Sequence, residues 1–205
     1  MSQIAFYILS DVHGFIFPTD FSSREKDLPM GLLKANHLIE QDCVHYDGSV
    51  KIDNGDFLQG SPLCNYLVSK LKSSLPLTSI YNRLGFDFGI VGNHEFNYDL
   101  PYLKQAINQL HYPVLCANII ENAQPFTGQG IHYFKVNDLT IGTIGLTTQY
   151  IPHWEQPDYI KTLTFNSAVH TLKSELPTLR EKSDIVVVSY HGGFERDLDS
   201  GLPTE

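Results

Sequence analysis

Four short segments of the sequence place a carboxylate, imidazole or carboxamide side chain beside a glycine, each directly after an apolar run. They are Asp11-Val12-His13-Gly14, Gly55-Asp56, Gly92-Asn93-His94-Glu95 and His191-Gly192-Gly193. Carboxylate and imidazole ligands together suit divalent metals such as Mn, Fe, Zn, Co or Ni. One Asp can bridge two such ions, and two ions about 3.5–4 Å apart can hold a phosphoryl group and activate a water. The glycines allow sharp turns and leave space for a phosphate.

Each segment alone also has an ordinary explanation. Asp-x-His after a strand is common, and Gly-Asp usually marks a turn. Asn93 and Glu95 could be turn and cap residues, and His191 could be a loop histidine. The set is more informative than its parts, because independent coincidences at four strand ends multiply. We therefore interpret the four segments together as a two-metal hydrolytic site.

The residues between these segments alternate between strand-like and helix-like patterns. Strands are predicted over Ile4–Ser10, Val50–Asn54, Phe86–Val91, Val114–Ala117 and Ile185–Ser189. Helices are predicted over Gly31–Gln41, Leu63–Leu71, Leu77–Leu84 and from an Asp99 cap through Gln109. Such alternation predicts an α/β fold, in which ligands collect beyond the carboxyl ends of the strands.

Turn and cap residues complete this prediction. Asn137-Asp138 predicts a hairpin turn between strands His132–Val136 and Leu139–Leu146. Asn166 is expected to cap a helix that runs toward Glu181, and Pro177 is expected to kink that helix or end it early. The hairpin adds antiparallel strands to the α/β fold.

Composition limits the possible partners. The chain has 205 residues, 42% of them hydrophobic, which is enough for one domain. Its formal net charge of −9 argues against a protein that wraps nucleic acid. A small anionic substrate remains compatible with this charge, because a bound metal can reverse the local field. The apolar run Ile4–Leu9 lacks a basic segment before it and is too short to span a membrane, so a cytoplasmic protein is expected.

The motifs also resemble a known family. Asp11-x-His13, Gly55-Asp56, the Gly-Asn-His-Glu segment and His191, in this order, resemble the calcineurin-like metallophosphoesterases over nearly the whole chain. Four stretches resemble the bacterial 5′-nucleotidase and 2′,3′-cyclic-nucleotide phosphodiesterase branch: Asp53–Pro62, Gly92–Tyr98, Cys116–Ile120 and Ile141–Gly145. The resemblance implies a four-layer α-β-β-α sandwich that hydrolyses a phosphoester with metal-activated water and no covalent intermediate.

The resemblance also implies a role for each site residue. The first of two divalent metal ions would be held by Asp11, His13 and Asp56. Asp56 would bridge to a second ion, which Asn93 and His191 would also bind. His94 would face the substrate and stabilise the transition state or protonate the leaving oxygen. Glu95 is expected to brace its loop.

The sequence departs from the family pattern in one respect. The family closes its site with a Gly-His-x-His segment, and the branch adds a C-terminal domain whose aromatic residues sandwich the nucleoside base. The sequence contains no Gly-His-x-His. We therefore expect residues 1–205 to be an incomplete catalytic domain, truncated at the C-terminus, that by itself is weakly active or inactive.

Position 97 bears on the substrate. The resembling 5′-nucleotidases often place an Asp there, paired with the histidine that corresponds to His94, whereas the cyclic-nucleotide phosphodiesterases place an Asn, as this sequence does. An Asn favours the protonated imidazole less than an Asp does, since it can only hydrogen-bond. A monoester dianion gains more from a cationic neighbour than a cyclic diester monoanion does. Asn97 thus favours 2′,3′-cyclic nucleotides as substrates, with 5′-nucleotides second.

Three alternatives stay open from the sequence. Asn97 could shape its loop and say nothing about substrate. The chain could be another metallophosphoesterase, either a protein phosphatase or a nuclease. It could also be a degenerate phosphoesterase domain that binds without catalysis.

Overall fold

A computed structural model describes residues 3–20, 22, 27–194 and 196–203. Its first sheet is parallel, with strand order β1-β2-β3-β4. The strands are β1 (Ile4–Leu9), β2 (Gly48–Asp53), β3 (Phe88–Ile90) and β4 (Val114–Leu115). Leu9 lies opposite Asp53 in the β1–β2 register. The residues that follow β1 and β2 therefore leave the sheet at the same edge.

The second sheet has strand order β10-β8-β7. Its strands are β7 (Ile131–Val136), β8 (Leu139–Thr147) and β10 (Ile185–His191). β7 and β8 form the predicted antiparallel hairpin, with Asn137 in the left-handed conformation that such a turn requires. β10 runs parallel to β8, and His191 lies opposite Thr147 at its end. The register thus places His191 at the carboxyl end of the second sheet.

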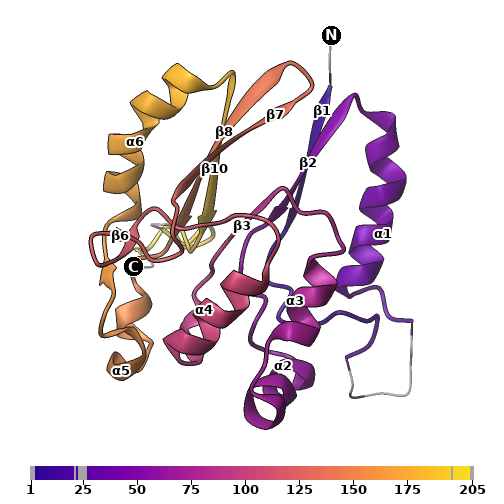
Figure 1. The fold of residues 1–205 in the computed structure, drawn as a ribbon, viewed down its shortest axis with the longest axis vertical. Coiled ribbons are helices and arrows are strands. Elements are labelled where there is room, and N and C mark those ends of the chain that lie inside the picture. Colours follow the sequence, from indigo (N-terminus) through magenta and orange to yellow (C-terminus); the bar gives the residue numbers. More distant parts are fainter. Residues whose placement is uncertain (1–2, 21, 23–26, 195, 204–205) are drawn as a thin grey trace.

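Helices cover the outer faces of both sheets (Figure 1). The first sheet is accompanied by α1 (Leu32–Asp42), α2 (Pro62–Tyr66), the π-helical Leu67–Leu71, α3 (Leu75–Tyr81) and α4 (Leu100–Gln109). On the opposite flank α6 (Ala168–Lys182) packs on the second sheet, where its Leu179 is buried with Ile144 and Leu146. None of the helices in the described part of the chain combines the length and apolar character needed to cross a bilayer.

An apolar core lies between the two sheets. Val50, Ile52 and Phe88 of the first sheet are buried with Ile141 of the second, and Phe134 packs against them. Phe88 and Phe134 have ring centroids 6.3 Å apart. Each sheet thus buries one face against the other sheet and one face under helices. This arrangement is the predicted α-β-β-α sandwich, and the fold prediction is confirmed.

Several short elements were not expected. A third sheet of order β6-β5-β9 is built from β5 (Ile119–Glu121), β6 (Gln124–Pro125) and β9 (Thr164–Phe165). Four short helices also occur: Cys43–His45, η3 (His94–Asn97), η4 (Ile151–His153) and α5 (Pro157–Ile160). Strands and helices of two to four residues are too short to show a readable hydrophobic period.

The predicted start of α6 was wrong by one residue. Ser167, not Asn166, is the N-cap, because its hydroxyl accepts the backbone N–H of His170 at 3.3 Å. Asn166 instead exchanges hydrogen bonds with Asn118, donating its backbone N–H at 2.9 Å and accepting from the side-chain amide at 3.1 Å. Pro177 does not end the helix early, since α6 continues to Lys182. The Asp99 cap of α4 is confirmed by its 2.9 Å bond from the Tyr102 N–H.

Candidate metal centre

The loops after β1 and β2 are tied together by their backbones. The N–H of Asp11 donates to the carbonyl of Gly55 at 3.1 Å, and the N–H of His13 donates to that of Asp56 at 2.8 Å. Asp11, His13 and Asp56 have positive φ angles of 56°, 50° and 60°. Left-handed non-glycine residues cost roughly 1 kcal/mol or more and gather at functional sites. The three predicted ligands therefore stand on a strained, hydrogen-bonded backbone.

Two carboxylates lie between two imidazoles. Asp56 Oδ2 is 3.2 Å from His191 Nε2 and 3.9 Å from His13 Nε2. Asp11 Oδ1 is 3.9 Å from each of the same two nitrogens. Asp11 is thus as close to His191 as to His13, although the family resemblance assigned it to the ion shared with His13.

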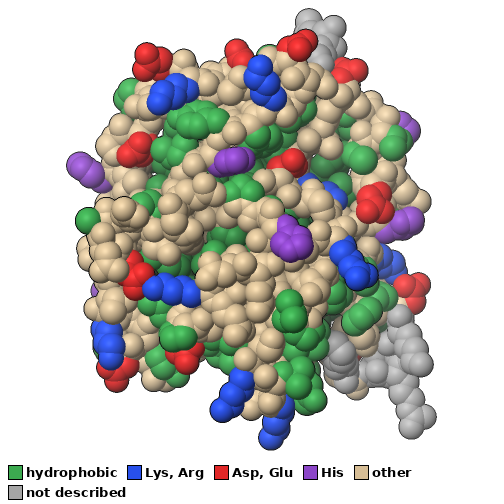
Figure 2. Space-filling view, in the orientation of Figure 1, with side chains coloured by type: hydrophobic (Ala, Val, Ile, Leu, Met, Phe, Trp, Pro, Cys, Tyr) green, Lys and Arg blue, Asp and Glu red, His purple; other side chains and the backbone are tan. Residues whose placement is uncertain are grey.

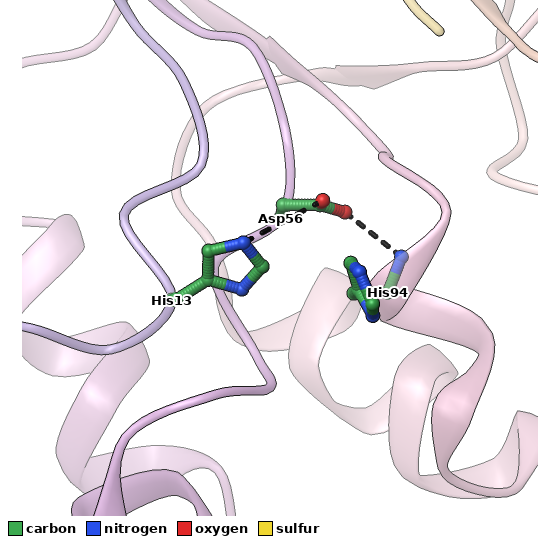
Figure 3. A group of neighbouring side chains, drawn as sticks. All are labelled: His13, Asp56 and His94. Atoms are coloured by element: carbon green, nitrogen blue, oxygen red, sulfur yellow. Dashed lines mark hydrogen bonds and ion pairs between the residues drawn. The ribbon is translucent and has the colours of Figure 1, made fainter.

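Asp56 belongs to two clusters of potential ligands. His13, Asp56 and His94 form one cluster (Figure 3), and Asp11, Asp56 and His191 form the other. Within each cluster the ligand atoms lie within 4.8 Å of one another. The resemblance assigned His94 to the substrate, so the first cluster contributes His13 and Asp56 to the predicted ligands. Asp56 is still shared by both clusters, which is the position that a bridging ligand requires.

The orientation of the imidazoles also fits a metal. Nδ1 of His13 lies 2.7 Å from the carbonyl oxygen of Gln59, and Nδ1 of His191 lies 2.6 Å from that of Asn54. Carbonyl oxygens only accept, so each Nδ1 carries the hydrogen and Nε2 is left toward the carboxylates. Metal-binding histidines are usually held this way, with the second ring nitrogen bonded to a carbonyl or carboxylate. The donor set therefore fits a divalent cation.

His191 and Asp56 each shift the pKa of the other in the direction that favours its charged form. Burial lowers the pKa of His191, but the hydrogen bond and the charge of Asp56 outweigh burial and raise that pKa to about 9. For Asp56, burial raises the pKa, while the bond and charge of His191 turn the net shift downward. A buried carboxylate that favours a cationic neighbour is suited to hold a metal ion.

Glu95 braces the site, as predicted. Its buried carboxylate accepts the backbone N–H groups of Asp56 at 2.6 Å, Phe57 at 2.7 Å, Leu58 at 3.1 Å and Gly92 at 2.7 Å. Burial and the nearby Asp56 charge raise the pKa of Glu95, and the backbone donors oppose that rise. The carboxylate joins the loop after β2 to the loop after β3.

Gly92 leaves room for Asp56. A Cβ atom at position 92 would lie 2.2 Å from Asp56 Oδ1 and 2.8 Å from its Cγ, far inside van der Waals contact. From the sequence, the glycines were expected to leave space for a phosphate. At Gly92 the space is occupied by the carboxylate of a predicted ligand instead.

Asn93, at the N-cap position of η3, and His94, the first residue of η3, lie beside these residues. Asn93 lines a cavity of about 260 Å³ together with Asp11, Asn54, Trp154 and His191. The backbone N–H of His94 donates to Asp56 Oδ1 at 2.8 Å, and its ring meets that of His13 edge-on at 5.2 Å. The structure thus brings all six predicted site residues to one place, while their roles as ligands or acid stay predictions.

Two residues near the site were missed from the sequence. Asn54 accepts from the Ser189 hydroxyl at 2.7 Å through its side chain and from His191 through its carbonyl. Its position inside the Asp53–Asp56 segment could have drawn attention to it. Glu155 accepts a hydrogen bond from the side-chain amide of Asn97. No local pattern marks Glu155, which lies far from Asn97 in the sequence.

Comparisons with known proteins give a consistent result. No protein-family profile matches the chain. The chain is 35% identical over 202 residues to a 2′,3′-cyclic-nucleotide 2′-phosphodiesterase/3′-nucleotidase from Salmonella typhimurium, covering 92% of this chain and 31% of that protein. A candidate 5′-nucleotidase from Staphylococcus aureus, solved with alpha-ketoglutarate, superposes with a TM-score of 0.93 and 64% identity, over 98% of this chain and 40% of that one. The calcineurin-like phosphoesterase YfkN from Bacillus subtilis superposes with a TM-score of 0.84 at 24% identity, over 97% of this chain and 65% of that one, which supports the fold.

The four-layer fold is the fold of the calcineurin-like phosphoesterase YfkN, and the two Asp/His clusters lie at the carboxyl ends of the strands in this chain. The chain is similar over nearly its whole length to part of the Salmonella 2′,3′-cyclic-nucleotide 2′-phosphodiesterase/3′-nucleotidase and of the Staphylococcus aureus candidate 5′-nucleotidase. It spans less than a third of the length of the Salmonella relative, 31%. The resemblance recognised from the sequence motifs is confirmed.

Proposed function

We propose that this protein hydrolyses phosphoesters of nucleotides, with 2′,3′-cyclic nucleotides preferred and 5′-nucleotides second. The observation that carries the proposal is the position of Asp56, shared by the two Asp/His clusters. The similarity to the Salmonella 2′,3′-cyclic-nucleotide 2′-phosphodiesterase/3′-nucleotidase supports the cyclic substrates. The Staphylococcus aureus structure, described as a candidate 5′-nucleotidase, supports the second class.

We assign metal binding to five side chains: Asp11, His13, Asp56, Asn93 and His191. Two divalent ions bound there would supply positive charge to phosphoryl oxygens and lower the pKa of water. His13 and His191 are held for this by the carbonyls at their Nδ1 atoms, and Asp56 is held by the loop that Glu95 braces.

His94 is proposed to act on the leaving group. Its Nδ1 is engaged by Asn97 Oδ1 at 2.5 Å, so Nε2 is the ring nitrogen left for the substrate. When the ring is protonated, Nε2 carries the second hydrogen and can donate a hydrogen bond or a proton to the leaving oxygen. The edge-on contact with His13 keeps the ring beside the Asp56 cluster.

The distribution of charge favours a small substrate over a polyanion. Figure 2 shows Lys and Arg side chains interspersed with Asp and Glu over the face that it draws, and the chain carries a formal net charge of −9. A protein that binds nucleic acid through its phosphates would instead present a continuous basic surface. This supports a nucleotide over a DNA or RNA strand as the substrate.

The structure changes one argument about substrate. The preference for cyclic nucleotides drew on Asn97 as an uncharged partner of His94. The carboxylate of Glu155 accepts a hydrogen bond from the Asn97 amide. A negative charge is therefore present in this region, separated from the His94 imidazole by the Asn97 side chain. The preference for cyclic nucleotides therefore rests mainly on the Salmonella relative.

A substrate panel tests the proposal. A full-length version of the protein, with any residues encoded after Glu205, is assayed with Mn²⁺ on 2′,3′-cyclic AMP, 3′-AMP, 5′-AMP, a phosphopeptide and a DNA oligonucleotide. Fastest hydrolysis of the cyclic diester is expected. Hydrolysis of only the phosphopeptide or the DNA would contradict the proposal, and metal binding without any turnover would favour the non-catalytic alternative.

A further inference from the structure

Three side chains form a hydrogen-bonded row that leads away from the candidate metal centre. His94 Nδ1 lies 2.5 Å from Asn97 Oδ1, and Asn97 Nδ2 donates to Glu155 Oε1. His94 and Asn97 are the first and last residues of η3. Glu155 comes from a separate segment, between η4 and α5. The row thus links the predicted acid to a carboxylate contributed by another part of the chain.

The chemistry of the row allows only one arrangement of hydrogens. An ionised carboxylate accepts and does not donate, so Glu155 must face the NH₂ end of the Asn97 amide. The amide oxygen then faces His94, and it too can only accept. His94 must therefore carry a hydrogen on Nδ1 whether the ring is neutral or protonated. Nε2 becomes the position that exchanges a proton with other groups.

Without Glu155 the Asn97 amide would lose this constraint. The two ends of an Asn side chain have nearly the same shape, and a 180° rotation exchanges them. A rotated amide would present NH₂ to Nδ1 and favour the opposite tautomer, with the hydrogen on Nε2 and none on Nδ1. The carboxylate is what distinguishes the two orientations.

The surroundings hold Glu155 in place. Its backbone N–H donates to the carbonyl of Ile151 at 3.0 Å, and Ile151 is fully buried. α5, which follows Glu155, packs against η3. Asn97 and Glu155 are both partly buried, which limits competition from water for their hydrogen bond.

We propose that Glu155 is a positioning residue that fixes the amide orientation of Asn97 and thereby the tautomer of His94. The consequence for catalysis rests on the proposed function, because it requires His94 to act on a leaving group. The effect on the tautomer does not depend on any activity. The two can therefore be tested separately.

The tautomer is read by NMR on the full chain. Long-range ¹H–¹⁵N spectra separate a protonated from an unprotonated ring nitrogen, and His94 is assigned by its loss in His94→Gln. Wild type is expected to show the hydrogen on Nδ1, and Glu155→Ala to populate the Nε2–H form. Adding Asn97→Asp to Glu155→Ala should restore Nδ1–H, because a carboxylate at position 97 accepts in either orientation. Asp158→Asn, which removes a charge from an exposed residue of the adjacent α5, is the control and should resemble wild type.

Kinetics give the second readout. With the best nucleotide substrate, Glu155→Ala should lower kcat about 10-fold with little change in KM, and Asn97→Asp should recover most of the loss. An unchanged His94 tautomer in Glu155→Ala would overturn the proposal, whereas a changed tautomer with undiminished kcat would overturn its consequence for catalysis. If wild type hydrolyses none of the substrates, the proposed function fails, and the NMR comparison still decides the role of Glu155.

Discussion

The carbonyl oxygen of Asn54 accepts a hydrogen bond from Nδ1 of His191 at 2.6 Å. Asn54 directly follows β2 in the first sheet, and His191 is the last residue of β10 in the second. The Ser189 hydroxyl adds a second link, donating to the Asn54 side chain at 2.7 Å. The two sheets are thus joined where the candidate ligands meet, so the ligand geometry depends on how the sheets pack.

Asp56→Asn should lower the metal content of the protein at both positions. The carboxylate is shared by both Asp/His clusters, and an amide has a single acceptor oxygen and no charge. Elemental analysis after dialysis measures the content. Trp154, the one tryptophan in the sequence, lines the cavity and provides a fluorescence signal for Mn²⁺ titration. Asp138→Asn, at the exposed β7–β8 turn, is the charge-matched control; unchanged metal content in Asp56→Asn would refute the assignment of the bridge.

Gly92→Ala should weaken metal binding without a change in any ligand. The added Cβ would stand 2.2 Å from Asp56 Oδ1 and push the carboxylate away. Gly128→Ala is the control, because a Cβ atom at position 128 would meet no neighbouring atom within 4 Å. The φ of +90° at this position should cost the variant about 1 kcal/mol of stability and leave the site intact. Mn²⁺ affinity and urea midpoints of both variants separate the two effects. Equal Mn²⁺ affinity in Gly92→Ala and wild type would show that the loop yields to the methyl group.

Glu95→Gln should destabilise the fold by roughly 3 kcal/mol, because the amide cannot accept all four backbone N–H groups and turns donors toward some of them. Urea unfolding measures the loss. Asp27→Asn breaks an ion pair whose carboxylate is exposed, and should cost less than about 1 kcal/mol. If Glu95→Gln lowered the free energy of unfolding as little as Asp27→Asn does, the assignment of Glu95 as a brace of the two loops would be wrong.

Asp53 should make the stability depend on pH. Burial raises its pKa from 3.8 to about 7, although the Tyr112 hydroxyl donates to it at 2.8 Å and opposes the rise. Between these values the folded state keeps a proton that the unfolded state has lost, so the free energy of unfolding falls as pH rises and levels off above about 7.

Asp53→Asn removes this titration and serves as the reference. The stability of wild type relative to the variant should fall by about 1.4 kcal/mol for each pH unit within the window. Urea unfolding of metal-free protein from pH 5 to 8 measures the difference. Parallel curves for the two proteins would show that Asp53 is already ionised in the folded state at pH 5.

Much of the fold and site could be predicted because both depend on local signals. β-rich apolar runs marked the strands, and each predicted ligand lies at the carboxyl end of one of them or in the loop that follows, as His191 ends β10. The ligand assignments and the expected cytoplasmic location stay predictions. Contacts between segments that are distant in the sequence could not be predicted from local patterns. Glu155 contacts Asn97 only because α5 packs on η3. Asn166 and Ser167 are both good caps, and only the Asn118 contacts show which one is free to cap.

The left-handed backbone at Asp11, His13 and Asp56 has a consequence for laboratory evolution. Glycine would relieve the strain at each of these three positions, while it would delete the side chain that the site needs. A library screened for heat resistance alone should therefore enrich glycine there and accumulate robust, inert proteins. A screen that also demands metal retention should keep Asp and His at the three positions and find its gains elsewhere.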